Sequence, residues 1–157
     1  MTNSHAKYLM LLVLLILPLT LKAQMKRGNF GAGVMFGEPS GITAKLWQGQ
    51  RNAFDFGLAW SFEHTNSMTM QADYLWHNYN IIKVDEGTMP IYYGVGGRVM
   101  VGNEGNVGIR VPVGVNYLFA HDPLGLFFEV APILDLAPST NFDLNADVGI
   151  RYYFGTK

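Results

Sequence analysis

The chain has 157 residues, enough for one domain, and contains no cysteine, which excludes disulfides and thiolate metal sites. A net charge of −1 excludes the broad basic field that binds nucleic acid, so we expect no nucleic-acid partner. Charged residues make up only 15% of the chain, against about 25% in ordinary soluble domains. The sequence therefore predicts a surface that is unusually poor in charge.

The N-terminal residues have the pattern of a secretory signal. Lys7 supplies a positive charge, a nearly pure apolar run covers 8–19, and 20–23 offer a cleavage site. The run is about a dozen residues long, whereas a membrane-spanning helix needs roughly 20. We predict a cleavable signal peptide at 1–23 and one domain at 24–157, and an uncleaved membrane anchor is the alternative.

A strict two-residue alternation begins after residue 28. Between 53 and 62, large apolar side chains share one face of an extended chain, and small or polar ones share the other. The apolar set of this stretch is Phe54, Phe56, Leu58, Trp60 and Phe62. Such a pattern is typical of a β-strand that lies between two unlike surroundings.

Eight segments show this alternation, and turn-forming residues separate them. In chain order they are 29–37, 42–47, 53–62, 68–77, 89–101, 107–119, 126–136 and 142–154. The longest connection is 78–88, and the others are short turns. Eight antiparallel strands with short links predict an all-β, up-and-down barrel.

The two faces indicate what surrounds this barrel. A soluble barrel encloses its large apolar side chains, whereas here the opposite face carries glycine, alanine and charges that suit a crowded interior. The wall would then face lipid, and closure is required because lipid cannot satisfy an exposed sheet edge. We predict an eight-stranded antiparallel transmembrane barrel. A soluble sandwich and a soluble lipid-binding barrel with inward aromatics are the alternatives.

The outward aromatic residues sort to two levels, as expected for girdles at the membrane surfaces. An even strand number places both ends of the chain on one side, which is the periplasmic side by the usual insertion rule. The outer level would hold Phe36, Trp60, Phe62 and Phe142. The periplasmic level would hold Phe30, Phe54, Trp76, Tyr93, Tyr117, Phe128, Tyr152 and Phe154.

The inward charges are the most distinctive candidate site. They are Lys45, Asp55, Asp73, Arg98, Arg110, Glu129, Asp135, Asp143, Asp147 and Arg151. Hairpin register predicts Lys45 opposite Asp55, Arg110 near Asp135, and Arg98 facing Arg110. Buried charges need partners, so we expect a salt-bridged interior that is mostly filled. A narrow ion path lined by these groups is the alternative.

The chain resembles the small outer-membrane barrels of the OmpA/OmpX type in Gram-negative bacteria. It is most similar to uncharacterised barrel proteins of the Bacteroidetes and spirochaetes. The motifs that carry this resemblance are 33–41, 55–62, 90–98 and 149–154. The resemblance implies the cell outer membrane as location, outer-membrane lipid as surroundings, and a closing strand read by the barrel-insertion machinery.

The expected role is non-enzymatic: envelope structure or binding at a rim. The remaining alternative is a lipid-modifying enzyme, for which Ser61, Glu63 and His64 are the only candidate group, and it lacks a second matching motif. We expect no catalytic residue, no metal and no cofactor. The longest link, 78–88, could contact a periplasmic partner.

Overall fold

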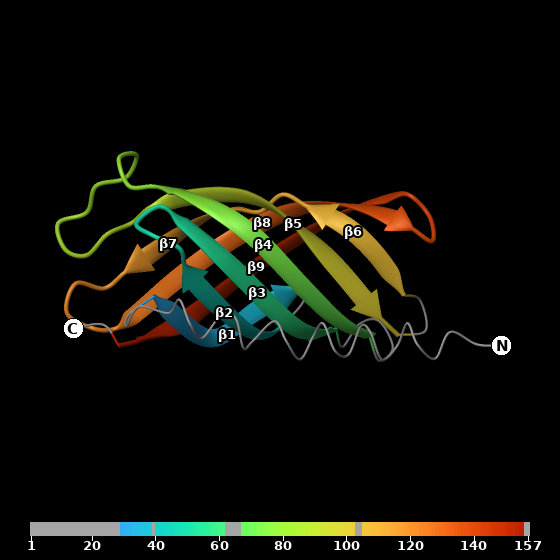
Figure 1. Ribbon diagram of the computed structural model, residues 1–157, viewed down its shortest axis with the longest axis horizontal. Helices are drawn as coiled ribbons and strands as arrows, with labels where there is room; N and C mark the ends of the chain where they lie inside the picture. Colours follow the sequence, from blue (N-terminus) through green and yellow to red (C-terminus); the bar gives the residue numbers. More distant parts are fainter. Residues whose placement is uncertain (1–28, 39, 62–66, 103–104, 156–157) are drawn as a thin grey trace.

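The computed structural model describes residues 29–38, 40–61, 67–102 and 105–155, and these form one antiparallel sheet that closes on itself (Figure 1). The predicted signal peptide at 1–23 lies outside the described residues. Within the described ranges, no helix is long and apolar enough to cross a membrane. The closed sheet makes the fold an all-β barrel, as the alternation predicts.

In the described part of the chain, nine strands build the barrel, and each one pairs with its neighbours in the ring. The first five are β1 (Phe30–Glu38), β2 (Ser40–Trp47), β3 (Asn52–Ser61), β4 (Ser67–Asn78) and β5 (Ile91–Val101). The others are β6 (Asn106–Arg110), β7 (Val113–Leu118), β8 (Leu124–Ala137) and β9 (Asn141–Phe154). Pairing of β1 with β9, from Phe30 opposite Phe154 to Glu38 opposite Ala146, closes the ring.

The predicted strand 107–119 is present but divided into β6 and β7. Pro112 lies at the break, and proline has no backbone N–H to give to a sheet ladder. Both pieces pair with β5 and β8, so together they fill one position of the ring. The Gly94 N–H donates to the Pro112 carbonyl at 2.9 Å, and the Val111 N–H donates to the Pro132 carbonyl at 3.0 Å. The nine strands therefore occupy the eight predicted positions.

The barrel has two ends, which we name by the chain. The terminal end holds Phe30, Phe154, the β2–β3 turn and the loop 79–90, and the far end holds the β1–β2 and β8–β9 turns. The loop 79–90 projects from the terminal end in green in Figure 1. An isolated bridge between Thr88 and Leu118 ties this loop to the end of β7.

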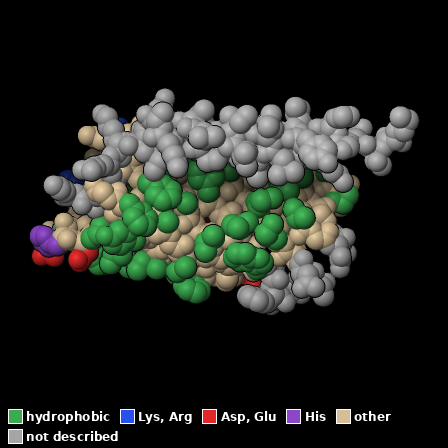
Figure 2. Space-filling model, turned by 60° about the horizontal axis from the view of Figure 1, so that its bottom comes forward, with side chains coloured by type: hydrophobic (Ala, Val, Ile, Leu, Met, Phe, Trp, Pro, Cys, Tyr) green, Lys and Arg blue, Asp and Glu red, His purple; other side chains and the backbone are tan. Residues whose placement is uncertain are grey.

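The wall and the interior have opposite chemistry. On the wall that Figure 2 shows, hydrophobic side chains spread over the strands, and coloured charges gather mainly at one end. Exposed wall residues include Ile42, Val95, Ile109 and Leu144. Most of the buried side chains are polar or charged. This is the inversion that the alternation predicts, and it places most of the large apolar side chains of the described residues on the outside.

Candidate functional site

The predicted interior charges form the candidate site, here called the lumen network. Nine of the ten are buried: Lys45, Asp55, Asp73, Arg98, Arg110, Glu129, Asp135, Asp147 and Arg151. The tenth, Asp143, lies at the far end with its side chain 47% exposed. The structure therefore collects the predicted set within one ring of strands, and ion pairs join nine of the ten, all except Asp147, in three groups.

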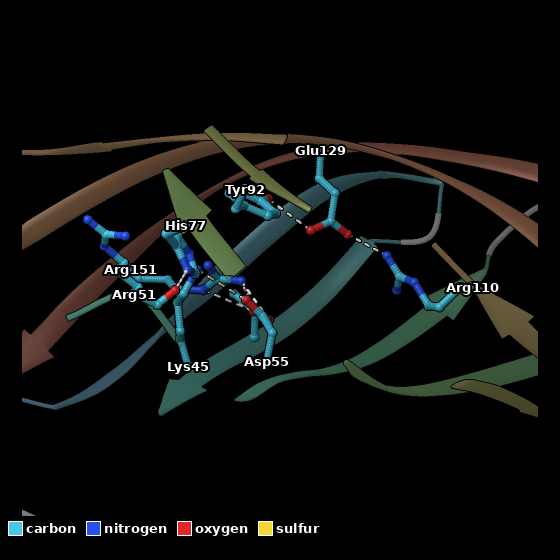
Figure 3. Close-up of polar contacts among 9 residues, drawn as sticks. Lys45, Arg51, Asp55, His77, Tyr92, Arg110, Glu129 and Arg151 are labelled. Atoms are coloured by element: carbon cyan, nitrogen blue, oxygen red, sulfur yellow. Dashed lines mark hydrogen bonds and ion pairs between the residues drawn. The ribbon is translucent and has the colours of Figure 1, made fainter. Parts of the chain in front are cut away.

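The first group lies toward the terminal end. Lys45 is directly opposite Asp55, as predicted, and its Nζ lies 3.7 Å from Asp55 Oδ2. Arg151 Nη2 donates to Asp55 Oδ1 at 2.9 Å and to Thr43 Oγ1 at 2.7 Å (Figure 3). Because Arg151 is on β9 and Asp55 on β3, which are not neighbours, this ion pair spans the lumen.

The second group lies near the middle and centres on Arg110, which is fully buried. Its guanidinium donates to Glu129, and its Nε lies 3.5 Å from Asp73 Oδ1. The Tyr92 hydroxyl donates to the other Glu129 oxygen at 2.8 Å (Figure 3). The predicted contact of Arg110 with Asp135 is wrong. The register of β6 and β8 puts Gly108 opposite Asp135 and Ile133 opposite Arg110.

The third group lies toward the far end. Arg98 donates to Asp135 at 2.9 Å and to Asp143 at 2.9 Å, and Asn106 donates to Asp135 at 3.2 Å. The predicted facing of Arg98 and Arg110 is wrong. Register places Arg98 opposite Gly108 and Arg110 opposite Gly96, so the two cations are offset and each contacts its own carboxylates.

A second layer, here called the aromatic floor, underlies the first group at the terminal end. It consists of Trp47, His77, Tyr92 and Tyr153, all buried. The Trp47 and His77 rings are 4.3 Å apart, and those of His77 and Tyr92 are 5.3 Å apart. Lys45 Nζ lies 5.0 Å from the Trp47 ring and 4.7 Å from the Tyr92 ring, a distance at which cation–π attraction operates.

Sequence reasoning missed this floor, although a signal for it was present. Tyr92 and Tyr153 each belong to a pair of adjacent aromatics, at 92–93 and 152–153. Neighbouring strand residues point to opposite faces, so one ring of each pair must face inward. Phe127, beside Phe128, follows the same rule and lies under the Arg151 guanidinium at 3.9 Å.

The predicted girdle residues lie on the wall. Phe36, Trp60, Phe142, Phe54, Trp76, Tyr93, Phe128, Tyr152 and Phe154 are exposed, and Phe30 and Tyr117 are half-buried. Toward the terminal end, neighbouring rings stack on one another. The ring centroids of Trp76 and Tyr93 are 5.9 Å apart, and those of Phe30 and Phe154 are also 5.9 Å apart. Phe62 lies outside the described residues, and the membrane role of the set stays a prediction.

The structure does not describe the side chains of the candidate catalytic group. Glu63 and His64 lie outside the described residues, as does the side chain of Ser61. Within the described ranges, no group of three or more histidine, aspartate or glutamate side chains could hold a metal ion. The chemistry that the described residues display is ion pairing.

Comparison with known proteins gives a fold and no sequence family. No family model matches the chain, and no curated protein sequence matches it. Among solved structures, the chain is similar to the N-terminal β-barrel domain of OprF from Pseudomonas aeruginosa, with a TM-score of 0.57 and 10% identity. The match covers 82% of this chain and 100% of that one. The finer likeness to Bacteroidetes and spirochaete barrels stays a prediction. At this identity the likeness shows the fold alone, which is a β-barrel.

Proposed function

We propose that this protein is an integral outer-membrane barrel whose lumen is closed by its own side chains, and that it acts without catalysis. Its role would be envelope structure or binding at a rim. One observation carries the proposal: ion pairs join strands across the lumen at three heights, through Arg151, Arg110 and Arg98. An eight-position barrel is just wide enough for side chains to fill.

The membrane location rests on the inverted wall. Soluble monomers rarely expose contiguous apolar patches above a few hundred Å², and here outward residues of every strand are apolar. Aromatic rings toward both ends suit the membrane surfaces, and an OmpA-like fold suits outer-membrane lipid and the barrel-insertion machinery. In this orientation the terminal end, with the loop 79–90, would face the periplasm and contact any partner there.

Location is tested on the outer-membrane fraction by gel electrophoresis with and without boiling. A closed barrel that resists detergent until it is boiled should run at two positions. A protein that fractionates with soluble periplasmic material and shows one position would contradict the membrane location.

Closure is tested by conductance in planar lipid bilayers. We expect no current steps from the unaltered barrel. Steady steps whose ion selectivity changes in Arg98→Gln and Arg110→Gln would instead support the narrow channel, because only lining charges control selectivity. Arg51→Gln, which removes a cation outside the lumen network, is the matched control.

A further inference from the structure

A pocket of about 440 Å³ lies at the terminal end of the barrel. Its lining comes from the residue before β1, the end of β2, the β2–β3 turn, the start of the loop 79–90 and the end of β7, and includes Asn29, Trp47, Gln50, Arg51, Tyr79 and Leu118. Small-molecule sites commonly measure about 300–1,000 Å³ and combine an apolar lining with a few polar groups. The size and the lining therefore fit a small ligand.

The base of the pocket is apolar and firmly held. Tyr79 and Leu118 pack on the cluster that Trp47 forms with Ala53 and Tyr153. The backbone N–H of Trp47 donates to the backbone carbonyl of Asn29 at 2.7 Å. Burial raises the pKa of Tyr79 to about 12, so its hydroxyl remains a neutral donor at ordinary pH. The base offers aromatic and aliphatic surface to an apolar group.

The mouth of the pocket carries a cation with no acid beside it. Arg51 is exposed and forms no ion pair with any carboxylate in the described part of the chain. Its backbone is fixed, because its carbonyl accepts a hydrogen bond from the His77 N–H at 2.7 Å. In Figure 3 its side chain extends away from the labelled ion pairs. The Arg51 backbone is thus anchored at the rim, and its exposed guanidinium is available for an anion.

We propose that this pocket binds a soluble amphipathic anion, a carboxylate or phosphate monoester attached to a ring or short apolar body. The apolar body would rest on Trp47, Tyr79 and Leu118. The anionic oxygens would take the planar donors of Arg51, which suit a two-point contact. This proposal specifies the rim binding named in the proposed function. It rests on that function only for the side of the membrane that the mouth of the pocket faces.

The probe is phenyl phosphate, with benzyl alcohol as its neutral counterpart, added to the folded barrel in neutral-lipid nanodiscs. Binding is followed by ¹⁵N NMR shifts of the Trp47 indole and the amides around Arg51. We expect saturable shifts with a Kd of about millimolar for phenyl phosphate, and a Kd at least about tenfold weaker for benzyl alcohol. Arg51→Gln should weaken phenyl phosphate binding about tenfold or more.

The matched control is Lys83→Gln, which removes one exposed cation from the loop at the same end and outside the pocket lining. It should change the Kd by less than about twofold. If both variants weaken phenyl phosphate binding equally, the effect comes from general charge and the proposal is overturned. If phenyl phosphate causes no saturable NMR shifts, the pocket does not bind it and the proposal is likewise overturned. The gel shift on boiling shows that each variant is folded.

A lipid headgroup carries the same phosphate chemistry, so the titration is repeated in nanodiscs that contain anionic lipid. If anionic lipid alone shifts the Trp47 and Arg51 signals and competes with the probe, the ligand is a headgroup and the soluble anion is overturned. Unchanged probe affinity supports the soluble ligand. Conductance tests closure separately, so failure of binding and failure of the proposed function give different results.

Discussion

Replacing Arg110 with methionine tests whether the lumen network stabilises the barrel. The Arg110 side chain is fully buried and contacts two buried carboxylates, Glu129 and Asp73. Methionine keeps much of the volume and removes the charge. Glu129 would retain the Tyr92 hydroxyl at 2.8 Å, but Asp73 would keep no ion pair with another described residue.

The expected loss in free energy of unfolding is about 3–5 kcal/mol, since breaking a buried pair leaves an uncompensated charge in a poorly solvated place. Adding Asp73→Asn removes the stranded charge. The double variant should therefore be more stable than the sum of the two single losses predicts, with a coupling of about 1–3 kcal/mol. Lys83→Met, on the exposed loop, should stay within about 0.5 kcal/mol.

The assay is reversible urea unfolding in lipid vesicles, followed by tryptophan fluorescence, with the free energy taken from the midpoint and slope. A loss below about 1 kcal/mol for Arg110→Met would refute the reasoning, because it would mean that water reaches the network. Strict additivity within about 0.5 kcal/mol would refute the coupling between Arg110 and Asp73.

Two further pairs of variants test the packing and the wall. Gly96→Ala should cost more than about 3 kcal/mol or prevent folding, because its Cβ would lie 1.9 Å from Asp73 Oδ1 and 2.2 Å from a backbone carbonyl oxygen. In Gly97→Ala the nearest atom would be 3.7 Å away, so the change should stay under about 0.5 kcal/mol; equal losses in urea unfolding would contradict this contrast. Val95→Arg, on the wall, should cost about 2–4 kcal/mol in vesicles, and Ile81→Arg, on the exposed loop, under about 0.5 kcal/mol. A wall variant as harmless as the loop variant would place the wall in water.

Strand order and facing could be predicted because both depend on a local property. Side chains alternate in any strand, so the period of apolar residues reveals the faces before any partner is known. Strand ends depend instead on the neighbouring chain. Ser40 belongs to β2 because Trp60 lies opposite it, although Ser40 does not extend the apolar alternation.

Contacts inside the lumen could be predicted only where the turn was centred correctly. The β2–β3 turn was centred correctly, and Lys45 therefore lies opposite Asp55 as predicted. The predicted contact of Arg110 with Asp135 assumed a β7–β8 turn centred one residue later than the observed turn, and this shifts the pairing by two residues, so that Gly108 lies opposite Asp135. An extra residue in β8 opposite Val107 and Gly108 shifts it again, and composition does not locate such a bulge.

The two ends of the lumen differ, and this difference decides where a function can lie. At the far end the network reaches the surface through Asp143, whose side chain is 47% exposed. At the terminal end the aromatic floor separates the network from the pocket beside Arg51. An ion that crossed would have to displace Arg110 and Lys45, both fully buried, and break their pairs with buried carboxylates, at about 3–5 kcal/mol for each broken pair. We infer that ligands meet this protein at its rims, and that the charges within hold the barrel closed.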